Sequence, residues 1–310
     1  MIAEFVLSWR LSLRIGKSCH ALINLEHLRA GGLAHRQYAS GFGKMMTNGP
    51  YNIAAGFYDQ FRPAYPVELI NFVIGLASKR DEYVDLGCGT GALLLKVAPQ
   101  FRRTVGVDAD RSMLQQATAK WRCVECEDVV LIEQKVEDYL ALRRTPLDLV
   151  TAGRSIHWMD QPCVMRRVHD LLNPDGVFAL VGDRVSLWDR ASGPFRAIRE
   201  VIANLEGRRD RPHLPVAGKD TSYQLTLQHL RESPFREYKR WECAVEYVWD
   251  AERVVKYFYS ASGFLTWLGP DRQAFEDEAA MLLGRLSSDM FHDVIEFGVT
   301  FCRRGPQSDS

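Results

Sequence analysis

A glycine-rich turn followed by a distant acid is the first arrangement in this 310-residue chain that suggests chemistry. The string EYVDLGCGTGALL (82–94) places Gly87, Gly89 and Gly91 between a short apolar stretch and a helical pattern. Glycines allow a sharp turn and a close approach of the backbone to a ligand. Asp108 follows nineteen residues after Gly89, where a carboxylate can accept both hydroxyl groups of a ribose. The pattern therefore predicts a nucleotide-type binding site.

A second candidate group is the pair His157 and Trp158, which follows an expected strand at 147–152. Parallel strands open at their carboxyl ends onto the ligand crevice. A histidine there can accept a proton from a hydroxyl or ammonium group near neutral pH. The alternative is a packed His–Trp pair that only supports the loop. Cys123 and Cys126 form a Cys-x-x-Cys pair without the further ligands of a zinc site, so we expect no metal.

The elements that must position these groups begin near residue 51. Two amphipathic helices are expected first, at 51–61 and 66–76. Strands and helices then alternate, which indicates a parallel sheet covered on both faces. The expected strands are 83–86, 104–107, 129–132, 147–152 and 177–181, and the expected helices between them are 92–98, 112–120 and 164–172. The closing part is predicted as a strand at 238–247, helices at 251–259 and 272–286, and an antiparallel strand at 293–302.

Two cofactor classes fit the glycine-rich turn. Gly87, Gly89 and Ala92 match the dinucleotide pattern of hydride-transfer enzymes. Asp85 with Gly87, Gly89 and Gly91 also matches the signature of class I S-adenosylmethionine methyltransferases. The second interpretation is favoured because two helices precede the turn, an acid stands at the strand end, and an antiparallel pair closes the chain.

Between residues 51 and 303 the sequence resembles class I S-adenosylmethionine-dependent methyltransferases. Within that class it is most similar to a small-molecule group that includes trans-aconitate methyltransferases and antibiotic-tailoring enzymes such as aminoglycoside methyltransferases. The strings FYDQFRPAYP (57–66), VDLGCGTG (84–91) and DLVTAGRSIHWMD (148–160) carry the resemblance. It implies an α/β fold with a doubly wound, seven-stranded, Rossmann-like sheet, an antiparallel last strand and an inserted helical lid.

The resemblance also implies a set of cofactor-binding residues. Asp108 is expected to hold the ribose of S-adenosylmethionine, with Ala109 and Met113 beside the adenine. The alternative for Met113 is ordinary core packing. The wall around the methionine part of the cofactor is expected to consist of Asp85, Gly87, Cys88, Gly89 and Gly91.

Two further parts of this expected site depart from simple motif matching. Lys135 stands where relatives often have an acid that binds the adenine amino group. The backbone of Val136 and the carboxylate of Glu137 are therefore expected to take that role. Arg62 is placed to pair with the cofactor carboxylate, and Tyr58 shares its helix face. The alternative for both is a surface pair at a helix end.

The composition is that of a globular chain, with 46% hydrophobic and 25% charged residues. Its 39 basic and 39 acidic side chains give a formal net charge of zero, so nothing in the overall charge favours nucleic acid or an anionic membrane. Seven cysteines, mostly isolated, favour a reducing compartment. No apolar run reaches the ~20 residues of a membrane span.

We expect three regions along the chain. Residues 1–48 are expected to be a poorly ordered N-terminal extension, although the arginine-rich, acid-poor stretch 1–45 also fits an organelle transit peptide. Residues 49–303 are expected to form the methyltransferase domain, with the lid at about 184–235. Residues 304–310 form a tail. A cytoplasmic location is favoured, with organelle targeting as the alternative.

The expected function is methyl transfer from S-adenosylmethionine, with S-adenosylhomocysteine as product, to an oxygen or nitrogen atom of a small polar metabolite. A secondary-metabolite or aminosugar antibiotic intermediate is favoured, and a carboxyl methyltransferase of the trans-aconitate type is the alternative. Outside the class, the alternatives are an NAD(P)-dependent oxidoreductase and a non-catalytic cofactor-binding protein. His157 is the expected proton acceptor and Tyr58 the next candidate. The expected partner is the small-molecule acceptor, without nucleic acid or membrane, in a monomer or homodimer.

Overall fold

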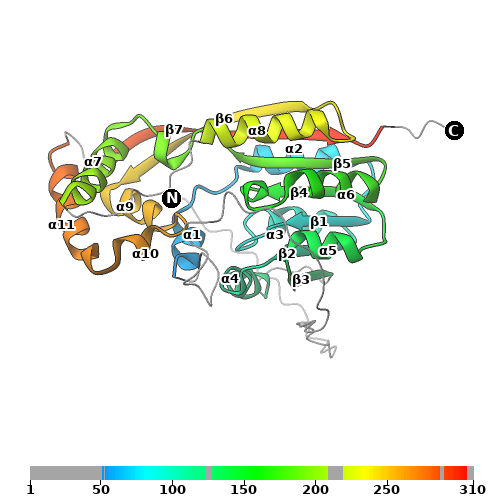
Figure 1. Cartoon of the computed structure of the whole chain (residues 1–310), viewed down its shortest axis with the longest axis horizontal. Helices are drawn as coiled ribbons and strands as arrows, with labels where there is room; N and C mark the ends of the chain where they lie inside the picture. The colour runs from blue at the N-terminus through cyan, green and yellow to red at the C-terminus, as the bar shows by residue number, and fades with distance from the viewer. Residues whose placement is uncertain (1–50, 52, 123–127, 209–218, 287–289, 306–310) are drawn as a thin grey trace, which may run out of the picture.

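The computed structural model describes residues 51, 53–122, 128–208, 219–286 and 290–305. These residues form a seven-stranded sheet in the order β3-β2-β1-β4-β5-β7-β6, flanked by helices (Figure 1). Strands β1 to β5 are parallel, and β7 runs antiparallel to both β5 and β6. The strands are β1 (Glu82–Leu86), β2 (Arg103–Asp108), β3 (Val129–Glu133), β4 (Leu147–Gly153), β5 (Leu172–Asp183), β6 (Lys239–Asp250) and β7 (Met290–Arg303).

This arrangement confirms the predicted doubly wound sheet with its antiparallel closing strand. The parallel strands lie within a few residues of their predicted positions, whereas the helix expected at 51–61 begins only at residue 55. The predicted extension 1–48 and the pair Cys123 and Cys126 lie outside the described residues. None of the helices in the described ranges is long and apolar enough to cross a membrane.

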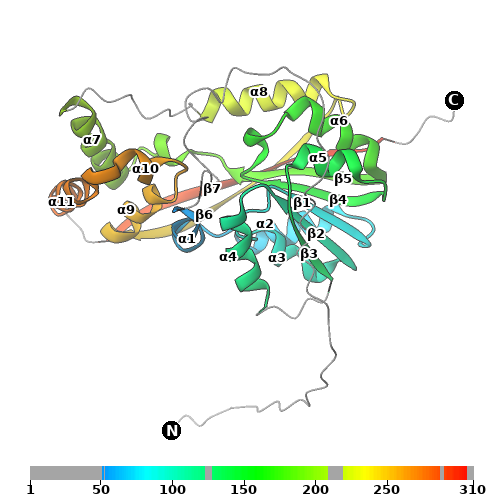
Figure 2. The same cartoon turned by 60° about the horizontal axis from the view of Figure 1, so that its bottom comes forward.

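Two hydrophobic clusters lie on the two faces of the parallel sheet. Tyr83 of β1 belongs to one cluster with Val73 and Leu94, whereas its neighbour Val84 belongs to the other with Leu140. Successive strand residues point to opposite faces, so β1, buried along its whole length, feeds both clusters. One face is covered by α2 (Val67–Leu76), α3 (Leu94–Val97) and α4 (Arg111–Trp121), and the other by α5 (Val136–Leu142), α6 (Gln161–Leu171) and α8 (Lys219–Glu232) (Figure 2).

Local sequence signals fix where these helices begin. Pro66 precedes α2 with extended backbone, where its missing N–H group costs nothing. Asp110 caps α4 by accepting hydrogen bonds from the backbone N–H groups of Ser112 and Met113 at 2.9 and 3.4 Å. Asp160 caps α6 through the N–H of Cys163 at 3.1 Å. Helix α4 thus begins three residues after the end of β2, and α6 begins eight residues after the end of β4.

The two antiparallel strands continue past the end of β5 and carry a second group of helices. The β5–β7 ladder ends at the pair Asp183 and Phe297, whereas the β6–β7 ladder continues to Asp250 and Met290. Residues 290–296 of β7 thus extend about 20 Å beyond β5 at ~3.4 Å per residue. Around this extension lie α7 (Gly193–Arg208), α9 (Ala251–Tyr259), α10 (Phe264–Leu268) and α11 (Arg272–Leu283), which we call the cap (Figure 1).

The segment 184–235, expected to form one inserted lid, divides between two places. Helix α7 packs against α9 and α11 in the cap. Helix α8 instead packs against α6, and its Leu227 and Leu230 join the core around Phe178. Each helix thus buries its own apolar face on a different surface, α7 in the cap and α8 against the parallel sheet. Helix α1 (Ala55–Phe61) links the two parts by packing against both α4 and α9.

Candidate active site

Two adjoining cavities lie at the carboxyl ends of the parallel strands. The first cavity has a volume of about 690 Å³ and is lined by the loops after β1, β2 and β3. The second cavity has a volume of about 490 Å³ and lies between the ends of β4 and β5, strands β6 and β7, and helix α8. Both cavities are lined by Tyr51, Tyr58, Arg154, Ser155 and Trp158. Ligands bound in the two cavities would therefore meet at this shared wall.

The glycines after β1 shape the first cavity in different ways. Gly87, Gly89 and Gly91 have φ values of +65°, +55° and +75°, which favour glycine strongly. A Cβ atom on Gly89 would meet no atom closer than the Met113 Cε at 3.8 Å. The same atom on Gly87 would lie only 2.5 Å from the Cβ of Ser155. The lack of a side chain at Gly89 thus leaves its backbone accessible to a ligand. The lack of one at Gly87 allows Ser155 of the shared wall to pack against the turn.

Asp108, at the end of β2, is held in place by the chain itself. Its Oδ2 accepts a hydrogen bond from the N–H of Gly89 and its Oδ1 from the N–H of Asp110, both at 2.8 Å. Burial raises the pKa of this carboxyl group, whereas the two backbone bonds lower it. Carboxylate oxygens have further lone pairs, so Asp108 can still accept the hydroxyl groups of a ribose.

Asp85 lies deeper, under the glycine-rich turn. Burial raises its pKa to about 7, while a hydrogen bond from Thr151 lowers it. The Oγ1 of Thr151 donates to the Oδ1 of Asp85 at 2.6 Å and lies 2.8 Å from the hydroxyl of Tyr83. This chain of bonds crosses from β1 to β4, where Asp85 and Thr151 are direct partners. Asp85 is therefore poised to change its charge near neutral pH.

The expected adenine-side residues also line the first cavity. These are Ala109, Met113, Val136 and Glu137. One oxygen of Glu137 already accepts a hydrogen bond from the backbone N–H of Asp160 at 2.8 Å, which leaves the other oxygen for a ligand. Asp85, Gly87, Cys88, Gly89 and Asp108 complete the predicted residues on this cavity.

Gly91 and Arg62 do not line the first cavity. Gly91 turns the chain into α3, where a Cβ atom would lie 3.1 Å from Leu95. Arg62, which was expected to pair with the cofactor carboxylate, lines the second cavity. It follows the last residue of α1 with extended backbone, and its guanidinium group lies between the rings of Tyr58 and Tyr257 at 5.0 and 5.1 Å.

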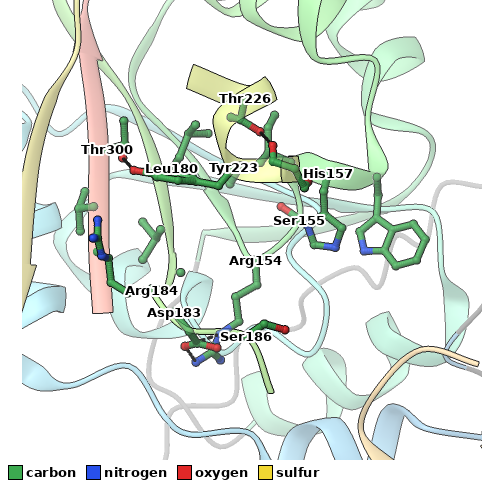
Figure 3. Close-up of a pocket in the computed structure, with 18 of the residues that line it drawn as sticks. Arg154, Ser155, His157, Leu180, Asp183, Arg184, Ser186, Tyr223, Thr226 and Thr300 are labelled. Atoms are coloured by element: carbon green, nitrogen blue, oxygen red, sulfur yellow. Dashed lines mark hydrogen bonds and ion pairs between the residues drawn. The ribbon is translucent and has the colours of Figure 1, made fainter. Parts of the chain in front are cut away.

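Sequence reasoning missed an ion pair between the second cavity and the core. The Nη2 of Arg154 lies 2.6 Å from the Oδ1 of Asp183 at the end of β5 (Figure 3). The same nitrogen donates to the carbonyl oxygen of Pro63 at 2.9 Å. Arg154 adopts a φ of +55°, which is unusual without glycine. Its place inside the string DLVTAGRSIHWMD was the available signal.

His157 lines the second cavity but not the first. It lies in the short 3-10 helix η2 (Ile156–Trp158) after β4, beside Ser155 (Figure 3). Its ring centroid is 5.2 Å from that of Trp158, which is itself 56% exposed. His157 is also exposed, so the pair is not buried packing and the imidazole is accessible to an acceptor. Tyr58, the other expected catalytic residue, lines both cavities.

The far wall of the second cavity comes from late parts of the chain. The hydroxyl of Tyr223 on α8 lies 3.0 Å from the Oγ1 of Thr300 on β7 (Figure 3). Arg184 forms an ion pair with Glu242 of β6 at 2.5 Å. Within the described ranges, no group of three or more histidine, cysteine, aspartate or glutamate side chains could hold a metal ion.

Comparisons with known proteins agree with this geometry. Residues 84–176 match the model of a methyltransferase domain family. The chain is 30% identical over 130 residues to CRG1 of Saccharomyces cerevisiae, named as an S-adenosylmethionine-dependent methyltransferase; the match covers 41% of this chain and 45% of CRG1. It is also 30% identical over 166 residues to an uncharacterized methyltransferase of Mycobacterium tuberculosis, covering 53% of this chain and 64% of that protein. The chain thus covers less than two thirds of either relative.

A solved structure extends the likeness to most of the fold. A candidate type II methyltransferase from Anaeromyxobacter dehalogenans superposes with a TM-score of 0.51 at 19% identity, covering 80% of this chain and all of that one. At this identity the likeness concerns the fold alone. The match to the methyltransferase domain supports S-adenosylmethionine as the cofactor, because the matched residues contain the loops that line the first cavity. The sheet therefore has the α/β, Rossmann-like methyltransferase fold, and residues 84–176, which include most of the loops around the first cavity, match a methyltransferase domain.

Proposed function

We propose that this chain transfers a methyl group from S-adenosylmethionine to an oxygen or nitrogen atom of a small polar metabolite. The observation that carries the proposal is the shared wall between the two cavities. A cofactor in the first cavity and an acceptor in the second would lie on either side of one set of residues. The second cavity, at about 490 Å³, is within the ~300–1,000 Å³ usual for small-molecule sites.

The chain's part in the reaction is alignment and exclusion of water. When bound, S-adenosylmethionine supplies an activated methyl group, so most of the remaining barrier depends on orientation. Three aromatic rings stand at the shared wall: the centroid of Tyr51 lies 5.5 Å from that of Tyr58 and 6.2 Å from that of Trp158. The backbone N–H of Tyr51 donates to the Oδ2 of Asp110 at 3.0 Å. This bond holds the rings close to the cofactor loops.

His157 is the proposed proton acceptor. An acceptor hydroxyl in the second cavity would transfer its proton to an imidazole nitrogen of His157 as its oxygen becomes methylated. A neutral amine would need less help, because its lone pair is already free. Tyr58, which lines both cavities, is the second candidate for this role.

Two acceptor classes are supported by separate features. The polar groups of Tyr223, Thr226 and Thr300 on the second cavity suit a hydroxylated compound such as an aminosugar antibiotic intermediate. Arginines on the same cavity, Arg62 and Arg184 among them, favour the alternative of a carboxylate acceptor of the trans-aconitate type. The first class remains the main proposal.

Ligand binding separates this function from an oxidoreductase. S-adenosylhomocysteine should raise the melting temperature and NAD should not, because a ligand that binds only the folded state stabilises it. Asp108→Ala should weaken S-adenosylhomocysteine by about 10- to 100-fold in a calorimetric titration, through the loss of charge-assisted hydrogen bonds. If NAD alone raised the melting temperature, the proposal would be wrong and an oxidoreductase that transfers hydride would be favoured.

Activity is then measured with S-adenosylmethionine carrying a tritium-labelled methyl group. The acceptors offered are aminosugars, sugar alcohols and small hydroxy and tricarboxylic acids. Transfer to an O or N atom of at least one of them supports the proposal. Cofactor binding without transfer to any acceptor would favour a non-catalytic cofactor-binding protein.

A further inference from the structure

Buried hydrogen-bond donors without partners gather where the cap meets the second cavity. The Nε of Arg62, the Nε and Nη2 of Arg190, the Nε1 of Trp249 and the hydroxyl of Tyr257 are all buried, and none has a hydrogen-bond partner among the residues that the structure describes. Buried polar groups are normally paired. Every one of these groups can donate a hydrogen bond, so a ligand that satisfies them must be rich in acceptors.

These side chains form one contiguous cluster. The guanidinium carbon of Arg62 lies 5.1 Å from the ring centroid of Tyr257, which stacks on Trp249 at 5.1 Å. The ring of Phe195 lies 5.2 Å from that of Trp249 and 5.6 Å from the guanidinium carbon of Arg190. Arg62 is the member of the cluster that lines the second cavity. It therefore connects the unpaired donors to the space where an acceptor would bind.

The charges around this cluster leave Arg62 uncompensated. Arg154 lies 2.6 Å from Asp183, and Arg190 lies 2.9 Å from Asp293. Arg62 has no ion pair within the described ranges, and its cationic group is held by the faces of Tyr58 and Tyr257.

The hydroxyl of Tyr257 remains a donor in this environment. Burial raises its pKa and outweighs the neighbouring Arg62, which lowers it. Arg154 and Arg190 lower the pKa as well, and Asp183 raises it. A protonated hydroxyl beside an unpaired guanidinium group suits an anionic ligand.

We infer that Arg62, supported by Tyr257, binds a carboxylate of the acceptor in the second cavity. The inference rests on the proposed function and adds the substrate class: the acceptor carries an anionic group, whichever of its atoms is methylated. The methionine carboxylate of the cofactor has the same chemistry. Arg62 lines the second cavity and not the first, which favours the acceptor as its source.

Four variants test the assignment. Arg62→Gln removes the charge, whereas Arg62→Lys keeps a point charge without the planar fork of donors. Tyr257→Phe removes only the hydroxyl and keeps the stacked ring. Arg253→Gln is the matched control, because Arg253 also lies over a tyrosine, Tyr247 at 5.5 Å, but is exposed and lines neither cavity. Circular dichroism and melting curves establish that each variant is folded.

The first measurement identifies the source of the carboxylate. S-adenosylhomocysteine and 5′-methylthioadenosine, which lacks the amino-acid carboxylate, are titrated calorimetrically into each protein. The inference expects Arg62→Gln to change neither affinity by more than about twofold. A loss of about tenfold or more for S-adenosylhomocysteine alone would assign Arg62 to the cofactor and overturn the inference. Failure of the wild type to bind S-adenosylhomocysteine would instead refute the proposed function.

The second measurement uses simple carboxylates on the complex with saturating S-adenosylhomocysteine. Acetate, malonate, succinate and tricarballylate are compared with their amides at constant ionic strength. At least one carboxylate should bind the wild type about tenfold or more better than its amide. Arg62→Gln should weaken that carboxylate by about 10- to 100-fold, and Tyr257→Phe by about 2- to 10-fold. Arg62→Lys should fall between Arg62→Gln and the wild type, and Arg253→Gln should match the wild type.

Three results of this second measurement would also overturn the inference. They are equal binding of every carboxylate and its amide, no binding of any carboxylate, and unchanged binding by both Arg62→Gln and Tyr257→Phe. If Arg62→Gln does not fold, the Tyr257→Phe result decides.

Discussion

The two cavities differ in how their buried polar groups are satisfied. In the first, both oxygens of Asp108 and one oxygen of Asp85 accept hydrogen bonds from the chain itself. Beside the second, the Nε of Arg62 and the hydroxyl of Tyr257 have no such partners among the described residues. The first cavity is therefore preformed for its ligand, whereas the second keeps donors that only a ligand or water can satisfy.

This difference follows from how each cavity is built. Apart from the shared wall, the first is lined mainly by consecutive strand ends and loops between residues 85 and 138. The second combines residues of α1, the ends of β4 and β5, helix α8, and strands β6 and β7. A site assembled from distant segments can change its lining without disturbing the sheet that holds the cofactor. The same parallel core can thus serve different acceptors.

The largest expected effect separates the cavities by function. Because His157 lines only the second cavity, His157→Ala should lower kcat on a hydroxyl acceptor by about 100-fold or more. The affinity for S-adenosylhomocysteine should not change. On an amine acceptor the loss should be small and partly recovered at higher pH. Steady-state kinetics measures kcat, and calorimetry measures the affinity for S-adenosylhomocysteine.

The control for this variant is His292→Ala. His292 is exposed on β7 and lines neither cavity. Its replacement should leave kcat unchanged. Unchanged turnover in His157→Ala on a hydroxyl acceptor, with normal melting behaviour, would exclude His157 as the base and leave Tyr58 to be tested.

A glycine at the shared wall should affect both cavities together. Gly87→Ala places a Cβ atom 2.5 Å from the Cβ of Ser155 at a φ of +65°. The left-handed backbone alone costs about 1–2 kcal/mol for a residue with a side chain, and the clash must displace Ser155. Urea unfolding should show a destabilisation above that range, with weaker binding of both ligands.

Gly75→Ala is the matched control for this clash. Gly75 lies in α2, and a Cβ atom there would meet nothing within 4 Å. Alanine should stabilise that helix by about 0.5–1 kcal/mol. If Gly87→Ala behaved like Gly75→Ala, the wall between the cavities would be adaptable and the comparison would fail.

The sequence predicted the first cavity because its chemistry is local. Gly87 and Gly89, which adopt positive φ values, lie close in the sequence to Asp108, the acid at the end of the next strand. Alternating strands and helices also predicted the sheet. The segment 184–235 was expected to form one helical lid, and nothing in the sequence indicated that α7 and α8 would cover different surfaces.

The second cavity was largely beyond prediction for the opposite reason. Arg62 belongs to a recognisable string. The position of its guanidinium group, however, depends on the ring of Tyr257, which is nearly two hundred residues away in the sequence. Arg154 lies in another such string, but its partner Asp183 becomes apparent only when β4 and β5 are paired. Partners brought together by the fold leave no spacing signal in one sequence.

The buried carboxyl group of Asp85 gives the first cavity a pH dependence. Its pKa is about 7 in the folded protein against an ordinary 3.8, so the folded state binds this proton more tightly than the unfolded state. The contribution of Asp85 to stability is therefore greatest below about pH 4 and is lost as the pH rises to about 7. Each pKa unit corresponds to about 1.4 kcal/mol.

Asp85→Asn should remove this slope from the ligand-free protein. Urea unfolding at several pH values between 5 and 8 should show the variant gaining on the wild type as the pH rises. Arg62 is not among the groups that shift the pKa of Asp85, so Arg62→Gln should leave this slope in place. Parallel curves for wild type and Asp85→Asn would mean that Asp85 keeps its charge throughout.

The smallest expected effect concerns two buried tyrosines, one beside each cavity. Removal of their hydroxyl groups should change the free energy of unfolding in opposite directions. The hydroxyl of Tyr83 lies 2.8 Å from the Oγ1 of Thr151, whereas that of Tyr257 has no partner in the described chain. Tyr83→Phe removes a net hydrogen bond and should destabilise the ligand-free protein by about 0.5–1.5 kcal/mol. Tyr257→Phe removes an unsatisfied group of about 1–3 kcal/mol and keeps the ring on Trp249. It should stabilise the ligand-free protein while weakening the carboxylate, as expected where function costs stability. Urea unfolding measures both, and equal destabilisation by the two changes would show that the Tyr257 hydroxyl is already satisfied without a ligand.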